Sequence, residues 1–183
     1  MIFNNPPDIL QFYINSYVRP GDTAVDATLG NGHDTKSLLE AVGESGKVYG
    51  FDIQKDAIDS TRSLIRNAAN AHLILDSHTE VDKYVACKIR CAVFNLGYLP
   101  GGDHSIATKP DSSVEAIGKC IDLLDDTGFI AVTIYHGGDT GFKERDNVLE
   151  YLKTLNCRKY GVTVYSFHNR PNNPPIFAVI EKR

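Results

Sequence analysis

A glycine-rich turn flanked by two acids follows the first β-rich segment of the sequence. Residues 25–35 read VDATLGNGHDT, so Gly30 and Gly32 lie between a strand and a helix, with Asp26 and Asp34 on either side. Glycine has no Cβ, so the backbone of such a turn can approach a ligand closely. The turn has no lysine or arginine to balance its two carboxylates, which disfavours a polyphosphate and suits a ligand that carries positive charge.

Thr35 occupies the position at which a dinucleotide-binding Gly-x-Gly-x-x-Gly motif has its third glycine. A pyrophosphate is therefore a poorer match to this turn than S-adenosylmethionine, whose sulfonium and ammonium groups are cationic. The same segment is also consistent with a plain tight turn in which Asp34 is the N-cap of the following helix. These residues alone leave both interpretations open.

Acidic residues also end the next two strands. Asp52 lies twenty residues after Gly32, at the end of the second strand. An acid there can accept both ribose hydroxyls of a nicotinamide or adenosylmethionine cofactor. Asp76 ends the third strand and can accept from an adenine amino group, although Asp76 and His78 could instead cap a helix at this junction. The spacing predicts a nucleoside site.

Asn95 ends the fourth strand, and the residues around it favour group transfer. Residues 94–103 read FNLGYLPGGD, which puts Asn95 three positions before Tyr98. This spacing resembles the Asn-Pro-Pro-Tyr motif of amino methyltransferases, in which the carboxamide oxygen accepts from the target amine and the ring packs on the base. Methyl transfer is an in-line displacement, so positioning of the acceptor contributes much of the acceleration.

An alkylamine acceptor must also lose a proton, which a carboxamide cannot take. The predicted proton acceptors lie on two adjoining loops: Asp103, His104, His136 and Asp139. The alternative for Asn95 is a buried polar residue that is satisfied by loop backbone.

Alternating helices and strands must bring these strand ends together. Hydrophobic periodicity predicts helices at 9–18, 34–42, 55–67, 81–87, 113–124 and 143–155. It predicts strands at 23–27, 47–52, 71–75, 91–96, 129–135, 159–167 and 176–181, with glycine-rich loops at 97–112 and 137–141. Crossover helices imply parallel strands, and the last strand must enter antiparallel because no helix precedes it. We expect an α/β fold with a seven-stranded, mostly parallel sheet, helices on both faces and a ligand at the carboxyl ends of the strands.

Length and composition favour one domain over residues 1–183. The chain is 42% apolar and carries 19 basic against 23 acidic residues, so its net charge of −4 disfavours a general polyanion binder. Its apolar stretches fall short of the roughly 18 residues of a membrane span. Residues 1–10 lack the pattern of a signal peptide, which predicts a cytoplasmic location. Four cysteines without a zinc-site spacing predict reduced thiols and no metal: Cys87, Cys91, Cys120 and Cys157.

Several segments together carry a family resemblance. They are DATLGNGHDT (26–35), GFDIQ (50–54), DSH (76–78), FNLGYLPGGD (94–103) and NNPP (172–175). They resemble the small bacterial methyltransferases long labelled rRNA methylases, whose members act on the wobble uridine of tRNA. The resemblance implies a class I, Rossmann-like methyltransferase that moves a methyl group from S-adenosylmethionine to the amine of 5-aminomethyl-2-thiouridine. It also implies a homodimer that binds the anticodon arm of tRNA.

The motifs assign residues to this expected activity. The expected cofactor residues are Asp26, Thr28, Gly30, Asn31, Gly32, His33, Asp34, Thr35, Asp52, Ile53, Gln54, Asp76, Ser77, His78 and Asn95. The expected catalytic residues are Asn95, Tyr98, His136 and Asp139. One segment departs from the family. Residues 135–141 read YHGGDTG, where the family more usually has a Tyr-Pro-Gly-His-like sequence followed by an acid and glycine.

An RNA substrate requires phosphate contacts and stacking on unpaired bases. The second half of the sequence supplies basic residues expected near the acceptor: Lys109, Lys143, Arg145, Arg158, Lys159 and Arg170. Tyr98, Phe167 and His168 could stack on bases. The predicted substrate residues are Gly97, Tyr98, Lys109, Arg145, Arg170 and Asn172. The alternatives are scattered solubilising charges and, for residues 168–175, a rigid hairpin connection.

The sequence leaves three alternatives to tRNA methylation. The same site could methylate rRNA or a small amine. A nicotinamide-dependent oxidoreductase is disfavoured by the missing third glycine. A noncatalytic adenosine sensor would use Asp52 but has no need of Asn95 at the end of the fourth strand.

Overall fold

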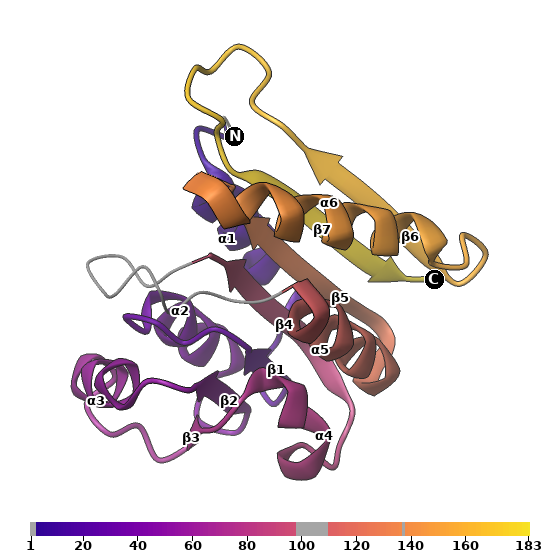
Figure 1. Cartoon of the computed structure of the whole chain (residues 1–183). Helices are drawn as coiled ribbons and strands as arrows, with labels where there is room; N and C mark the ends of the chain where they lie inside the picture. The colour runs from indigo at the N-terminus through magenta and orange to yellow at the C-terminus, as the bar shows by residue number, and fades with distance from the viewer. Residues whose placement is uncertain (1–2, 98–109, 137) are drawn as a thin grey trace.

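The computed structural model describes residues 3–97, 110–136 and 138–183, without the side chains of residue 110 and residues 138–140. Its centre is a seven-stranded sheet with the strand order β3-β2-β1-β4-β5-β7-β6 (Figure 1). The strands are β1 (Thr23–Asp26), β2 (Lys47–Asp52), β3 (Ala71–Leu75), β4 (Ile89–Leu96), β5 (Leu124–Ile134), β6 (Tyr160–Tyr165) and β7 (Ile176–Lys182).

Strand direction follows the expectation from the sequence. Strands β1 to β5 pair in parallel, and β7 pairs antiparallel with both β5 and β6. The order of the chain reverses between β1 and β4, which are neighbours with Asp26 in register with Val93. A mostly parallel sheet of this kind binds ligands where the order reverses, at the carboxyl ends of the strands.

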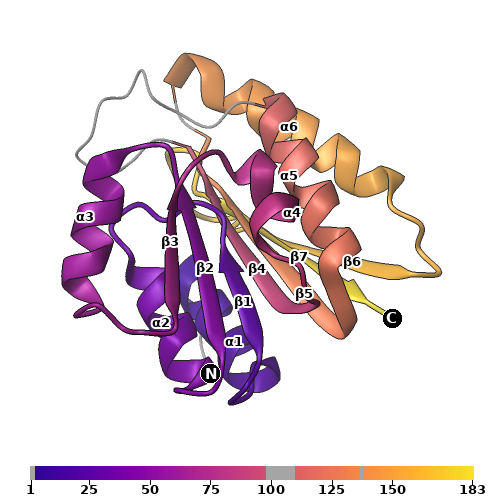
Figure 2. The ribbon, with the colours of Figure 1, turned by 90° about the horizontal axis from the view of Figure 1, so that it is seen from below.

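Helices cover both faces of the sheet (Figure 2). They are α1 (Pro6–Tyr17), α2 (His33–Val42) and α3 (Lys55–Leu64) on one face, and the 3₁₀ helix η1 (His78–Glu80), α4 (Val81–Tyr84), α5 (Pro110–Leu123) and α6 (Gly138–Thr154) on the other. The core has a cluster on each face. Ile14 and Leu38 pack with Phe129 in one cluster, and Ile117 and Val148 belong to the other. The predicted fold class is confirmed.

Helix α6 begins earlier than predicted, so the loop predicted at 137–141 is wrong for residues 138–141, and residue 137 lies outside the described residues. Helix α6 starts at Gly138 and includes Gly141. A Cβ built at Gly141 would lie 3.0 Å from the Cα of His136. Glycine at this position therefore serves close packing of the helix against the end of β5, and its presence in the sequence does not mark a loop.

The bounds of α3, α4 and α5 differ from the predicted bounds by about one helical turn. Helix α3 ends at Leu64 because Arg66 and Asn67 adopt positive φ angles of 52° and 55°. The segment predicted as a helix at 81–87 forms a single turn after η1. Of the loop predicted at 97–112, residues 98–109 lie outside the described residues, and residues 110–112 belong to α5.

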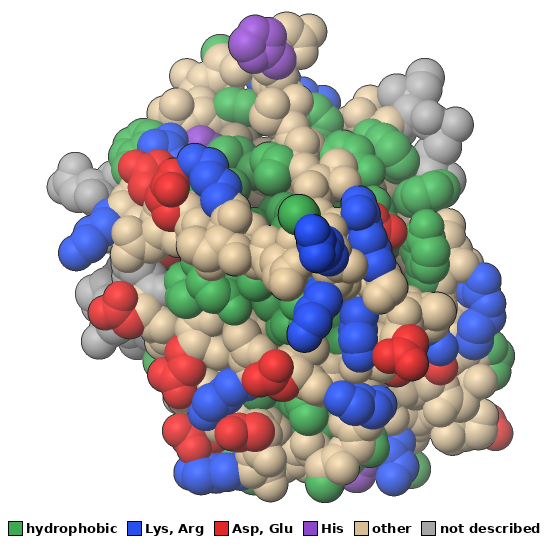
Figure 3. Space-filling model, turned by 90° about the vertical axis from the view of Figure 1, so that its right-hand side faces the viewer, with side chains coloured by type: hydrophobic (Ala, Val, Ile, Leu, Met, Phe, Trp, Pro, Cys, Tyr) green, Lys and Arg blue, Asp and Glu red, His purple; other side chains and the backbone are tan. Residues whose placement is uncertain are grey.

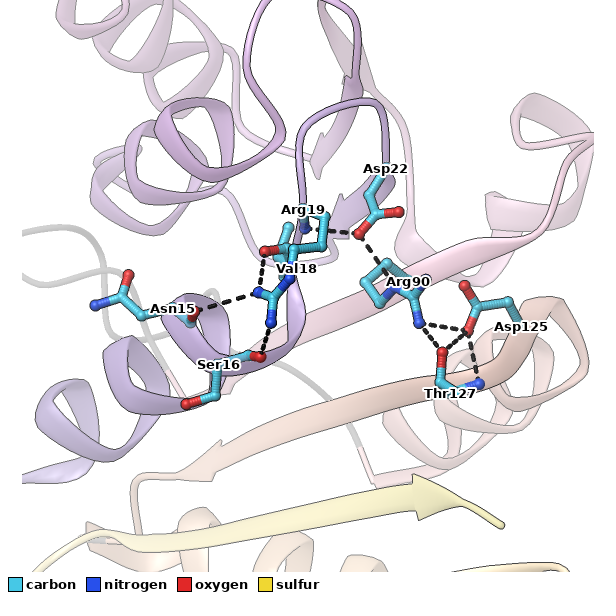
Figure 4. Close-up of polar contacts among 8 residues, drawn as sticks. All are labelled: Asn15, Ser16, Val18, Arg19, Asp22, Arg90, Asp125 and Thr127. Carbon is cyan, nitrogen blue, oxygen red and sulfur yellow. Dashed lines mark hydrogen bonds and ion pairs between the residues drawn. The ribbon is translucent and has the colours of Figure 1, made fainter.

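Arg90 joins three elements at the amino ends of the strands, far along the sheet from their carboxyl ends (Figure 4). Its guanidinium lies 3.1 Å from Asp22 Oδ2 and 3.2 Å from Asp125 Oδ1, and it also donates to Thr127. The backbone N–H of Arg19 donates to the same oxygen of Asp22 at 2.8 Å. This network holds the starts of β1, β4 and β5 together, so its role is to stabilise the sheet.

The helices of the described residues were also compared with the length and apolarity of a membrane span. None of them is both long and apolar enough to cross a bilayer.

Candidate functional site

The turn after β1 is built around the buried carboxylate of Asp26, which is 0% exposed. Its Oδ2 accepts a 2.6 Å hydrogen bond from the Thr35 hydroxyl, and its Oδ1 accepts from the backbone N–H of Thr28 at 3.3 Å. Burial, followed by the negative charge of Asp34, raises the pKa of Asp26 to about 7. Asp26 therefore ties the end of β1 to the first turn of α2.

The two glycines of the turn adopt left-handed backbone conformations, with φ of 51° at Gly30 and 80° at Gly32. A Cβ at Gly32 would lie 2.6 Å from the Thr61 hydroxyl oxygen on α3. Gly32 is also the N-cap residue of α2, so the prediction that Asp34 is the N-cap is wrong. The Asp34 side chain is engaged elsewhere, because it accepts from Asn95.

Asp52 connects the first two strand ends. Its Oδ2 accepts from the backbone N–H of Gly30 at 3.0 Å, and its Oδ1 accepts from the N–H of Gln54 at 2.9 Å. A carboxylate oxygen has two lone pairs, so each oxygen of Asp52 can accept one more hydrogen bond. Asp52 is thus held rigidly and can still receive the two hydroxyls of a ribose. The neighbouring Ile53 side chain is 62% exposed and offers an apolar surface to a base.

The end of β3 carries a second held carboxylate. Asp76 accepts from the backbone N–H of Ser77 at 2.8 Å and from the Tyr84 hydroxyl at 2.9 Å. The Ser77 N–H, followed by the Tyr84 hydroxyl, lowers the pKa of Asp76. Helix capping at this junction falls to Ser77, whose hydroxyl accepts from the N–H of Thr79. Asp76 is therefore ionised and leaves the capping to its neighbour.

His78 lies beside this strand end with its ring turned into the protein. The ring contacts Phe94 edge-on at 6.2 Å, and burial lowers the pKa of His78. Its Nε2 is buried and has no hydrogen-bond partner among the described residues. A buried polar atom of this kind is available to a ligand or a bound water.

Asn95 is fixed at both its main chain and its side chain. Its backbone N–H donates to the Thr28 hydroxyl at 2.6 Å, and its Nδ2 donates to Asp34 Oδ2 at 2.7 Å. Burial raises the pKa of Asp34, and the hydrogen bond from Asn95 opposes that shift. The predicted groups of the first turn and the fourth strand therefore meet in one place.

Tyr135 is a neighbour of this place that sequence reasoning did not assign. Its backbone N–H donates to the carbonyl of Leu96 at 3.0 Å, and its Cβ would lie 3.2 Å from a Cβ built at Gly97. Burial, followed by the negative charge of Asp34, raises the pKa of the Tyr135 hydroxyl, yet 43% of the residue is exposed. The position of Tyr135 in the sequence could have identified it as a site residue, because Tyr135 directly follows β5, which pairs in parallel with β4 of Asn95.

His136, predicted as catalytic, is buried under α6. Its Nδ1 lies 3.3 Å from the carbonyl of Ile134, and its ring packs edge-on against Phe142. The other groups predicted for proton transfer or acceptor binding fall outside the described part of the chain: Tyr98, Asp103, His104, Lys109 and the side chain of Asp139.

The predicted RNA contacts divide between two edges of the sheet. Strand β6 runs in the same direction as β5, so Phe167 and Arg170, which follow β6, lie at the edge of Asn95. The guanidinium of Arg170 stacks on the Phe167 ring at 4.4 Å. Asn172 has a positive φ of 63° in the connection to β7, which fits a rigid turn. Arg145 lies 5.0 Å from the centre of the Phe142 ring and pairs with Asp146.

Arg158 and Lys159 were expected beside the acceptor, and this is wrong. They precede β6, and the start of β6 pairs with the end of β7, at the edge away from Asn95. The direction of β6 is the reason, because it places the two ends of the same strand at opposite edges. Figure 3 shows the right-hand side of the view in Figure 1, where basic side chains gather near the middle of a face that also carries acids.

The charge of the site fits a cationic ligand. Four acids lie at the carboxyl ends of three adjacent strands: Asp26 and Asp34 around the turn after β1, Asp52 at the end of β2 and Asp76 after β3. Within the described residues, none of these four acids forms an ion pair with a lysine or arginine. Gly32 lets the turn pack closely against Thr61 on α3, where a Cβ would clash. The described residues contain no group of three histidine, cysteine or acidic residues that could hold a metal ion.

The sheet order and the acidic strand ends together are those of the S-adenosylmethionine-dependent methyltransferases of Rossmann-like fold. A crystal structure of a putative rRNA-methylase from Clostridium thermocellum is 46% identical, with a TM-score of 0.97 over 100% of both chains. A putative methyltransferase from Streptococcus mutans, in complex with SAH, is 37% identical, with a TM-score of 0.91 over 100% of both chains.

The family model described as "Putative rRNA methylase" matches residues 48–181, and the chain belongs to this family. A curated relative, the chloroplastic "tRNA (mnm(5)s(2)U34)-methyltransferase" of Arabidopsis thaliana, is 34% identical over 178 residues. That alignment covers 90% of this chain and 65% of the relative, so the chain spans about two thirds of the relative's length. The predicted family, fold class and cofactor are confirmed.

Proposed function

We propose that this protein transfers a methyl group from S-adenosylmethionine to the amine of 5-aminomethyl-2-thiouridine at the wobble position of tRNA. The observation that carries the proposal is the carboxamide of Asn95, held at the end of β4 within 2.7 Å of Asp34 on the glycine-rich turn. A hydrogen-bond acceptor held beside the cofactor turn suits a substrate that presents N–H donors, as an amine does. The curated Arabidopsis relative supports the choice of tRNA.

The cofactor would lie over the turn after β1. Asp52 would accept the ribose hydroxyls, Asp76 would accept from the adenine amino group, and Gly30 and Gly32 would let the backbone approach. When bound, S-adenosylmethionine supplies a methyl group on a sulfonium leaving group. The acidic side chains of Asp26 and Asp34 would favour a cation at this turn, and a bound cation would in turn favour their ionised forms.

Asn95 would act on the acceptor by positioning. Its carboxamide oxygen accepts a hydrogen bond from the amine, which aims the nitrogen lone pair at the methyl carbon opposite sulfur. The ammonium form of the acceptor first loses one proton to water, since the carboxamide cannot take it. The new bond then joins nitrogen to the methyl carbon, and the electron pair of the carbon–sulfur bond goes to sulfur, which gives S-adenosylhomocysteine and a secondary ammonium. Tyr135 presents an exposed ring next to Asn95 on which a uridine base can stack.

The RNA would approach the edge of the sheet that carries Asn95. Arg170 with Phe167 and Arg145 with Phe142 each form a cation on an aromatic ring, a combination suited to phosphate and unpaired bases. The anticodon arm is the region that presents the wobble uridine. A homodimer and a cytoplasmic location remain predictions that accompany this proposal.

Nucleoside mass spectrometry tests the substrate. tRNA from a strain that lacks this gene is expected to accumulate 5-aminomethyl-2-thiouridine and to lose the methylaminomethyl form. The purified protein with S-adenosylmethionine should restore the methylated nucleoside in that tRNA and should leave rRNA from the same strain unmethylated. An unchanged ratio of the two nucleosides in the deletion strain would reject the tRNA assignment.

Calorimetry tests the cofactor class independently of the substrate. S-adenosylmethionine and S-adenosylhomocysteine are expected to bind, and NAD is expected not to bind. Tight binding of NAD alone would favour the oxidoreductase alternative.

A further inference from the structure

Asp34 stands in the first turn of α2, and its carboxylate faces β4. Its Oδ2 accepts the 2.7 Å hydrogen bond from Asn95 Nδ2, which joins residues that are 61 positions apart in the chain. We propose that Asp34 is a positioning residue that orients the Asn95 carboxamide, so that the carboxamide oxygen faces the acceptor amine. This inference rests on the proposed function and deepens it.

The turn leaves Asp34 available for this task. Gly32 is the N-cap residue of α2 and adopts a left-handed conformation, so the helix begins without a side-chain cap. Thr35, the next residue, points inward to the buried Asp26. Asp34 therefore projects toward the end of β4.

The main chain of Asn95 is fixed separately. The Thr28 hydroxyl accepts from its backbone N–H at 2.6 Å, and the strand register pairs Asn95 with Thr133 on β5. With the backbone held on both sides, the remaining freedom of Asn95 lies in its side-chain torsions. The hydrogen bond to Asp34 removes that freedom.

Asp34 Oδ2 accepts the hydrogen bond from Asn95 Nδ2, so the NH₂ group of Asn95 is the group that faces Asp34. The planar carboxamide then turns its oxygen to the other side. An amine that is about to react presents N–H donors and needs an acceptor, which this oxygen provides. Without the carboxylate, the amide could rotate by half a turn and present NH₂ to the amine, which would repel its N–H groups.

Two simpler roles for Asp34 make different predictions. If Asp34 serves only to bind the cationic cofactor, its replacement affects cofactor affinity and has no effect on kcat when the cofactor is saturating. If Asp34 serves only to stabilise the start of α2, its effect is independent of the side chain at position 95. A positioning role predicts that its effect on kcat depends on Asn95.

The test is a double-mutant cycle in the full-length protein. Asp34→Asn, Asn95→Ala and the double variant are assayed for methyl transfer to tRNA from the deletion strain, with S-adenosylmethionine shown to be saturating for each variant. The control is Asp56→Asn, which removes an acid from the same first-turn position of helix α3, where the side chain is exposed.

We expect Asp34→Asn and Asn95→Ala each to lower kcat by about tenfold or more, because each removes the oriented acceptor. The double variant should stay within about twofold of Asn95→Ala, since Asp34 acts through that carboxamide. Asp56→Asn should stay within about twofold of the unmodified protein. An unchanged kcat in Asp34→Asn, or a double variant that shows the product of the two single losses, would overturn the proposal.

A second measurement needs no substrate. The side-chain amide protons of Asn95 are assigned by NMR from the signals that disappear in Asn95→Ala. We expect one of these protons to resonate downfield, as in a charge-assisted hydrogen bond, and to move upfield in Asp34→Asn but not in Asp56→Asn. If Asp34→Asn fails to fold, as judged by circular dichroism, Asp34→Ala replaces it in both measurements.

The two measurements separate the two proposals. If the unmodified protein methylates no tRNA while the amide signal depends on Asp34, the proposed substrate is wrong and the orientation of Asn95 by Asp34 stands. If tRNA is methylated and the amide signal is the same in Asp34→Asn and the unmodified protein, the positioning role is wrong and the proposed function stands.

Discussion

The hydroxyl of Thr35 donates a 2.6 Å hydrogen bond to the fully buried carboxylate of Asp26. Among the described residues, the Asp26 carboxylate accepts one other hydrogen bond, from the backbone N–H of Thr28. Removal of one partner leaves a buried polar group that must be desolvated without compensation. The turn after β1 therefore depends on Thr35 as well as on its glycines.

Replacement of Thr35 by valine keeps the shape of the side chain and removes the hydroxyl. We expect the free energy of unfolding to fall by about 1–3 kcal/mol, as for a buried acceptor that loses its donor. Urea denaturation measures the change. Thr163→Val on the exposed face of β6 is the matched control and should change stability by less than about 0.5 kcal/mol. Equal stabilities of the two variants would mean that Asp26 does not need this donor.

Asp26 also predicts a pH dependence of stability. Burial and the charge of Asp34 raise its pKa to about 7, so the folded protein holds a proton that the unfolded chain releases near pH 4. The folded state binds more protons between these values, and the contribution of Asp26 to stability therefore falls as the pH rises from about 4 to about 7. The difference in unfolding free energy between the unmodified protein and Asp26→Asn should fall through this window and be constant above it.

Asp76→Asn serves as the comparison of opposite sign. The pKa of Asp76 is lowered by the Ser77 N–H and the Tyr84 hydroxyl, so its contribution is present above its unfolded pKa and is lost as the pH falls. The difference in unfolding free energy between the unmodified protein and Asp26→Asn should therefore fall as the pH rises, whereas the difference for Asp76→Asn should rise. A difference for Asp26→Asn that rises with pH would contradict the assignment of a raised pKa.

The strand ends of the site could be predicted from the sequence because each one is marked by a change in residue type. The apolar runs that form β1, β2 and β4 end at Asp26, Asp52 and Asn95, and parallel pairing brings these ends to one edge. The reversed strand β7 followed from the missing helix before it. Local pattern and connectivity were enough for these features.

Contacts between distant residues could not be predicted in the same way. The hydrogen bond from Asn95 to Asp34 depends on the angle at which α2 leaves its turn. From the residue pattern alone, Asp34 could equally be the N-cap of α2, a position that Gly32 takes. The glycine-rich pattern predicts a loop at Gly141, because the packing partner of this residue, the backbone of His136, is only visible in three dimensions. The misplaced Lys159 shows the same limit, since its edge of the sheet depends on the direction of β6.

We expect that removal of the Arg90 guanidinium lowers the stability of the protein and leaves cofactor binding intact. Its guanidinium bridges Asp22 and Asp125 at the amino ends of the strands and is 20% exposed. Arg90→Met keeps the aliphatic stem and leaves two partly buried carboxylates without a cation. We expect the free energy of unfolding to fall by about 1–3 kcal/mol, with the affinity for S-adenosylmethionine unchanged.

The control for Arg90 is Arg62→Met, which breaks an exposed pair with Asp59 on α3. Exposed pairs contribute about 0–1 kcal/mol, so this variant should be nearly as stable as the unmodified protein. Thermal melting of both variants and calorimetry with the cofactor give the two readouts. Weakened cofactor binding in Arg90→Met would show that the network at the amino ends reaches the site.

We expect that a side chain at position 32 weakens cofactor binding and that a smaller side chain at position 61 restores part of it. Alanine at this position would have to adopt a φ of 80° and would bring its Cβ within 2.6 Å of the Thr61 hydroxyl oxygen. The turn must shift to relieve this contact, so we expect Gly32→Ala to weaken binding of S-adenosylmethionine by at least about tenfold, which corresponds to about 1.4 kcal/mol. Thr61→Ala removes the two closest atoms and should restore part of the affinity.

Gly43→Ala separates the backbone cost from the steric one. Gly43 has a φ of 62° after the other end of α2, and a Cβ there would meet only ordinary contacts, with Pro20 at 3.7 Å. This variant carries the same kind of backbone strain away from the site, so it should lower stability and leave cofactor affinity unchanged. If Gly32→Ala binds S-adenosylmethionine as well as Gly43→Ala does, the close approach of the turn to Thr61 is not what shapes the cofactor site.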